Sequence, residues 1–215
     1  MLTAFGTGTP ARVAAPAVPS RLLPDTPPQA QIVALHGPMR IQLPVAQARL
    51  TALGYHASPG SGLALEPLGT QGNRGLLRRF TDRIFGSPSS GLVYYRLDGG
   101  GSPNVLDVGA APGTDVFSPV DGTVVGITDF VLSGRARGVR VDVQPASAPS
   151  LVVSVTRLRA DPALTVGMSV AAGTSKLGTI LDLSRLESQA LARFTQDAGN
   201  HVSLEVHPAP TLTLP

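Results

Sequence analysis

A mainly β fold, a β-rich α+β protein built around an antiparallel sheet, is what the sequence predicts. The chain of 215 residues contains 24 Gly and 20 Pro, which favour many turns and short strands over long helices. Its second half has short runs rich in β-branched residues at 123–127, 139–143 and 151–155. Within 139–143, valines alternate with Arg140 and Asp142, the pattern of a strand that has one face in the core and one in water.

The composition excludes several functional classes. The chain has no Cys, which excludes disulfides, thiolate zinc ligands and cysteine nucleophiles. The formal net charge is only +3, and the densest basic cluster, within 74–83, has the spacing of a solvated helix face. Aromatic residues make up 4% of the chain, so a base-stacking surface is not expected. We therefore predict no nucleic-acid partner.

Residues 1–30 are predicted to be a disordered tether, because they are rich in Pro, Ala and Thr and have little apolar surface to bury. No apolar run reaches the length of about 20 residues that spans a membrane, and residues 1–5 are too short for the apolar part of a signal peptide. The stretch begins abruptly on apolar residues. We expect it to be the outer remnant of an upstream anchor, through which alone the protein would reach a membrane.

Residues 31–97 are predicted to form an appended N-terminal region. Apolar residues at 32–35 and 41–43 indicate two short strands around a turn, and an apolar stripe at helical spacing covers 76–85. Tyr94 and Tyr95 are adjacent, so on a strand they would point to opposite faces. His56 is a lone histidine near a loop, which is more typical of a structural residue than of a ligand.

Residues 98–215 are predicted to form the main β domain, with one inserted helix before the last strand. The helix is expected over 184–194, because Ser184 and Glu187 form a capping box and apolar residues share one face of the segment. The last strand is expected at 202–206, where three apolar residues alternate with Ser203 and Glu205.

Four segments of this domain, taken in order, resemble the lysostaphin-like (LytM-type) peptidoglycan endopeptidases. They are 107–116 (DVGAAPGTDV), 118–125 (SPVDGTVV), 166–178 (VGMSVAAGTSKLG) and 199–206 (GNHVSLEV). The segment at 118–125 would suit the hairpin of a lipoyl-type carrier equally well, and the match to the peptidases depends on the four segments together. The resemblance implies an antiparallel, barrel-like β-sheet and an extracytoplasmic location in a bacterium.

The resemblance also implies a degenerate zinc site. In the family, zinc is bound by a His four residues before the motif Asp, by that Asp, and by the second His of His-x-His. Here Asp107 matches the carboxylate, but Pro103 and Ser203 occupy the two histidine positions. His201 matches the first His of the pair, which assists the attacking water, and Arg157 falls where the family has its other assisting His. A catalytic zinc usually has three protein ligands, so we expect no zinc cofactor and no catalysis.

The expected function is that of a non-catalytic cell-wall module that binds peptidoglycan or acts as a regulator or scaffold of cell-wall hydrolases. Its cleft would be lined by Asp107, Arg157, His201 and Ser203, and we expect Arg157 either to pair with Asp107 or to bind an acidic group of the ligand. The first alternative is an active zinc metalloendopeptidase whose atypical ligands include an N-terminal His. The second is a binding or carrier module unrelated to the cell wall, although the only lysine, Lys176, is not near the candidate hairpin.

Overall fold

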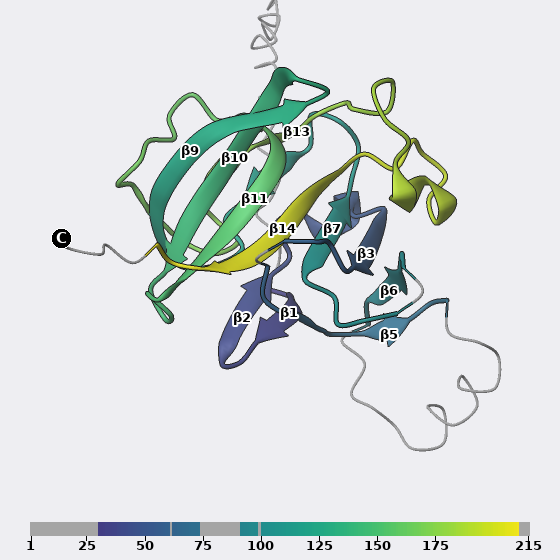
Figure 1. The fold of residues 1–215 in the computed structure, drawn as a ribbon, viewed down its shortest axis with the longest axis horizontal. Coiled ribbons are helices and arrows are strands. Elements are labelled where there is room, and N and C mark those ends of the chain that lie inside the picture. Colours follow the sequence, from purple (N-terminus) through teal and green to yellow (C-terminus); the bar gives the residue numbers. More distant parts are fainter. Residues whose placement is uncertain (1–29, 61, 74–90, 99, 211–215) are drawn as a thin grey trace, which may run out of the picture.

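The computed structural model describes residues 30–60, 62–73, 91–98 and 100–210 (Figure 1). The protein is mainly β, as predicted. Within these ranges the helical elements are two short 3-10 helices, η1 (Gln47–Arg49) and η2 (Ala190–Arg193), and no helix is long and apolar enough to cross a membrane. The tether predicted at 1–30, apart from its last residue, and the apolar stripe predicted at 76–85 lie outside the described residues.

The strands form one large sheet and one small sheet. The small sheet has three strands in the order β2-β1-β4. The large sheet has eleven, with the main order β12-β9-β10-β11-β14-β7-β3-β6-β5; β13 pairs with β11, and β8 pairs with β13. The strands are β1 (Ile32–His36), β2 (Met39–Gln42), β3 (Ala52–His56), β4 (Glu66–Pro67), β5 (Thr70–Gln71), β6 (Val93–Arg96), β7 (Val105–Gly109), β8 (Asp115–Phe117), β9 (Gly122–Leu132), β10 (Arg135–Pro145), β11 (Leu151–Ala160), β12 (Ser169–Val170), β13 (Lys176–Ile180) and β14 (His201–Pro208).

The large sheet continues across the predicted boundary between residues 97 and 98. β3 pairs antiparallel with β7, and β6 pairs parallel with β3, so strands from both predicted regions share one ladder. The two strands predicted around the turn at 36–38 are β1 and β2. The small sheet is attached to the large one by a buried hydrogen bond, in which the Tyr55 hydroxyl on β3 donates to the Val33 carbonyl on β1 at 2.7 Å.

The three central strands β14, β7 and β3 present an apolar face and a polar face. Register brings side chains from the three strands into rows, because directly paired residues point to the same side of an antiparallel sheet. Two adjacent rows on the apolar face are completely buried and form the centre of the core: Leu53, Val108 and Val202, then Tyr55, Leu106 and Leu204. The row between them on the opposite face is Gly54, Asp107 and Ser203.

The predicted helix over 184–194 is wrong, and only the four residues of η2 are helical there. Glu187 does not act in a capping box, because its carboxylate accepts a hydrogen bond from Arg157. Gln189 is extended, with φ −90° and ψ 121°, which interrupts any helix between the two halves of the segment. The apolar stripe is also split, since Leu191 is fully buried whereas Leu186 is 45% exposed. Tertiary contacts therefore override a pattern that is locally helical.

Candidate functional site

Asp107 lies at the centre of the polar face. It is on β7 between two neighbouring strands, opposite Ser203 of β14 and Gly54 of β3. Its side chain is only 5% exposed. The Ser203 hydroxyl donates a hydrogen bond of 2.6 Å to Asp107 Oδ1. The strand register therefore brings together the two residues that the sequence motifs place at zinc-ligand positions.

His201 contacts the same carboxylate from the start of β14. It precedes Ser203 by two residues and so points to the same face, with its Nε2 3.6 Å from Asp107 Oδ1. Its Nδ1 lies 2.9 Å from the Gly199 carbonyl, which can only accept, so Nδ1 carries a proton. The imidazole is buried, with 4% of its side chain exposed.

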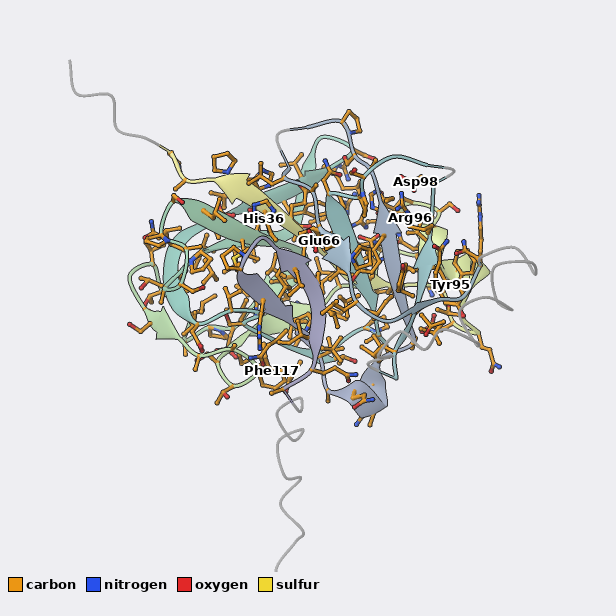
Figure 2. All side chains as sticks on the ribbon, turned by 90° about the horizontal axis from the view of Figure 1, so that it is seen from below. His36, Glu66, Tyr95, Arg96, Asp98 and Phe117 are labelled. Atoms are coloured by element: carbon orange, nitrogen blue, oxygen red, sulfur yellow. The ribbon has the colours of Figure 1, made fainter. Side chains whose placement is uncertain are left out.

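His56 is the residue whose place the sequence reasoning missed. It is the last residue of β3, and its Nε2 lies 3.3 Å from Asp107 Oδ2, on the oxygen that His201 does not contact. Asp98 holds the chain directly after it by accepting a hydrogen bond from the Ala57 amide, and Arg96 pairs with Asp98 at 3.0 Å (Figure 2). No motif marks this histidine, because its contact with Asp107 exists only through the pairing of β3 with β7.

The two imidazoles keep the buried carboxylate ionised. Burial acts to raise the pKa of Asp107, but the charge of His201 and the hydrogen bond from His56 outweigh it and hold this pKa below its ordinary value of 3.8. The hydrogen bond to Asp107 in turn raises the pKa of His56 above 6.5, against the opposing effect of burial. The cluster of Asp107, His56, His201 and Ser203 is thus a compact charge network, called the Asp107 cluster below.

These shifts predict a stability maximum in mildly acid solution. Because the pKa of Asp107 is lowered in the folded protein, its contribution to stability is present above pH 3.8. This contribution is lost as the pH falls through the pKa of the folded state. Because the pKa of His56 is raised in the folded protein, its contribution to stability is complete below pH 6.5. This contribution is lost as the pH rises through the pKa of the folded state. We expect chemical denaturation to give a higher unfolding free energy at about pH 5.5 than at about pH 8.5.

In the His56→Gln variant the unfolding free energy should not decline between about pH 6 and pH 8.5, because the titrating group is gone. His36→Gln, on β1 and in contact with the Ala64 carbonyl, serves as the matched control and should keep the decline. An equal decline in wild type and His56→Gln would show that His56 does not stabilise Asp107.

Arg157 does not pair with Asp107, so the first of its two expected roles is wrong, and its binding of an acidic ligand group stays a prediction. Its guanidinium donates to Glu187 and, at 3.4 Å, to Gln189, and it lies 5.6 Å from the centre of the Phe130 ring. Its backbone is in the left-handed region, with φ 68°, which non-glycine residues adopt only when other contacts compensate. The buried carboxylate is instead contacted by His56 of β3 and His201 of β14.

The residues at the family's zinc positions do not fit a zinc ion. Pro103 is buried and has no side-chain donor atom, and the Ser203 hydroxyl is engaged with the carboxylate itself. His56 and His201 approach different oxygens of Asp107, which is the geometry of two ion pairs. In the part of the chain that the structure describes, no group of three or more His, Cys, Asp or Glu is arranged to hold a metal ion.

The fold and the site together define a mainly β protein with a buried carboxylate–histidine cluster on the polar face of its central sheet. Comparisons with protein-family models and with characterised proteins gave no match. Among solved structures, one described as a novel M23 metalloprotease, pseudoalterin, from the deep sea is similar at a TM-score of 0.37, with 16% identity over 78% of this chain and 70% of that one. We draw no function from a similarity of this size.

Proposed function

We propose that this protein is a non-catalytic LytM-type module that binds peptidoglycan in the extracytoplasmic space and thereby positions or regulates cell-wall hydrolases. One observation carries the proposal: Ser203 stands opposite Asp107 and hydrogen-bonds to it, at the position where the sequence resemblance expects a metal-binding imidazole. Without a bound metal, no water is brought to a pKa near neutrality for attack on a peptide bond. The chemistry that remains to the site is binding.

The polar face extends beyond the Asp107 cluster and offers a surface for such binding. One row runs from Asp142 on β10 through Ser154 on β11 to Glu205 on β14. Arg140 donates to Asp142 at 2.7 Å and to Ser154 at 2.8 Å, and Glu205 lies 3.1 Å from His207. Arg140 and Glu205 remain 39% and 33% exposed, so both can also reach a ligand. A row of hydrogen-bonding side chains that crosses three strands suits an extended, polar polymer such as a peptide-bearing glycan.

Co-sedimentation with purified bacterial sacculi tests the proposal. The wild-type protein should sediment with sacculi and release no soluble peptide. Arg140→Gln should weaken the binding several-fold, because it removes the cation at the exposed end of the row. Arg40→Gln is the matched control, because Arg40 is exposed on β2 of the small sheet and its loss changes the net charge equally. This variant should bind as the wild type does.

Two results would overturn this function. Failure of the wild type to sediment would favour a binding module unrelated to the cell wall. Release of peptides that is abolished by Asp107→Asn would favour an active endopeptidase with atypical ligands.

A further inference from the structure

The segment between β13 and β14, residues 182–199, is held against the polar face by side chains rather than by a strand ladder. It contains η2, and Figure 1 shows it beside β7 and β3. Its two ends are joined, because the Leu183 amide donates to Asn200 Oδ1 at 2.9 Å. Its last residue, Gly199, provides the carbonyl that orients His201. We call this segment the strap.

Leu191 of the strap is packed directly onto the face that carries Asp107. Its Cδ2 is 2.7 Å from where a Cβ would stand on Gly54, and its Cδ1 is 3.3 Å from the corresponding point on Gly109. Gly54 is the direct neighbour of Asp107 and Gly109 that of His201 in the strand register. The two glycines leave room for Leu191, which is fully buried. The leucine therefore occupies the surface that a ligand of the Asp107 cluster would need.

Two further contacts hold the strap in this position. Arg157 on β11 donates to Glu187 and Gln189, and its left-handed backbone conformation lies at an irregularity of β11 opposite Val139 and Val141. On the other side, the Phe194 ring is stacked on Tyr95 of β6, with ring centres 4.3 Å apart and planes 13° from parallel. The strap is thus fastened at both ends of η2 to different strands of the sheet.

We infer that the strap is an autoinhibitory cover: Leu191 closes Asp107 and His201, the Arg157–Glu187 pair is its latch, and the extended polar ligand gains access to His201 only when the strap is displaced. The inference rests on the proposed function for the nature of the ligand. Its structural half, the covering of His201, does not depend on that function. With 4% and 5% of their side chains exposed, His201 and Asp107 are closed to solvent in this arrangement.

Chemical modification of His201 measures the opening directly. Diethyl pyrocarbonate reacts with accessible imidazoles, and peptide mass spectrometry reports the rate at each of the four histidines. Glu187→Gln, which removes the charge of the latch, and Leu191→Ala, which removes the cover, should each raise the rate at His201 several-fold relative to His36. Amide exchange in 183–193 should rise in the same variants.

Matched controls separate opening from general loss of stability. Asp115→Asn breaks a partly exposed ion pair with Lys176, and Leu177→Ala removes a fully buried leucine from β13. Both variants should leave the ratio of the His201 modification rate to the His36 modification rate unchanged. An unchanged ratio in both strap variants, or an equal rise in Leu177→Ala, overturns the cover.

Sedimentation of the same variants with sacculi separates the two proposals. Tighter binding by Glu187→Gln and Leu191→Ala supports both. A raised His201 rate without any sacculus binding supports the cover and overturns the cell-wall function.

Discussion

We expect the free energy of unfolding of the Asp107→Ala variant to be about 3 kcal/mol lower than that of the wild type. The substitution leaves the buried Ser203 hydroxyl without its acceptor and removes the carboxylate that faces the His201 imidazole, which is almost inaccessible to water. Asp107→Asn retains the volume and an acceptor for Ser203 but not the charge, so its cost should be intermediate, about 2 kcal/mol. Urea denaturation of the three proteins at about pH 6 measures the difference.

Asp115→Ala is the control for loss of a carboxylate on the same sheet. Its partner Lys176 is 37% exposed, and ion pairs of this kind contribute under about 1 kcal/mol. If Asp107→Ala and Asp115→Ala lower the free energy of unfolding equally, the Asp107 cluster does not help to hold β3, β7 and β14 together.

We expect the single substitution Ser203→His to create a zinc site. The new imidazole would stand directly opposite Asp107, where paired side chains have Cβ atoms about 5 Å apart. With Asp107 and one of the two existing histidines it would supply the three protein ligands that a zinc ion usually has. The variant should bind about one zinc per chain, and zinc at about 100 times its Kd should raise the unfolding free energy by about 2.7 kcal/mol.

Ser154→His provides the matched control, because Ser154 is on the same face but its hydroxyl bonds to Asp142 rather than to Asp107. That variant should gain no zinc affinity. The double variant Ser203→His with Asp107→Asn should lose the zinc affinity that Ser203→His alone provides. A folded Ser203→His protein without zinc affinity would mean that position 203 does not correspond to the second histidine of the peptidase motif.

The strands were accessible to sequence reasoning because their pattern is local. Val141 and Val143 of β10, and the alternating residues of β14, are buried as their spacing predicts. The pairing of Asp107 with Ser203 followed from motifs that mark two strands, and in the fold these strands are neighbours.

The remaining features depend on long-range contacts that no local pattern encodes. His56 reaches Asp107 only because β3 adds to the edge of β7. Arg157 turns to the strap because Glu187 is presented there, and the same contact removes the capping box that predicted a helix. The resemblance to a zinc site suggested that Asp107, without a metal, would need Arg157 as a partner, whereas two histidines already contact this carboxylate.

The metal content of the wild-type protein tests the central claim most directly. The protein would be incubated with excess zinc, desalted, and analysed by inductively coupled plasma mass spectrometry, with peptide release from peptidoglycan measured on the same sample. We predict well below one zinc per chain and no peptide release, because Asp107 is the only residue that matches the three zinc-ligand positions of the resemblance. About one tightly held zinc per chain, lost together with hydrolysis in Asp107→Asn, would contradict the account.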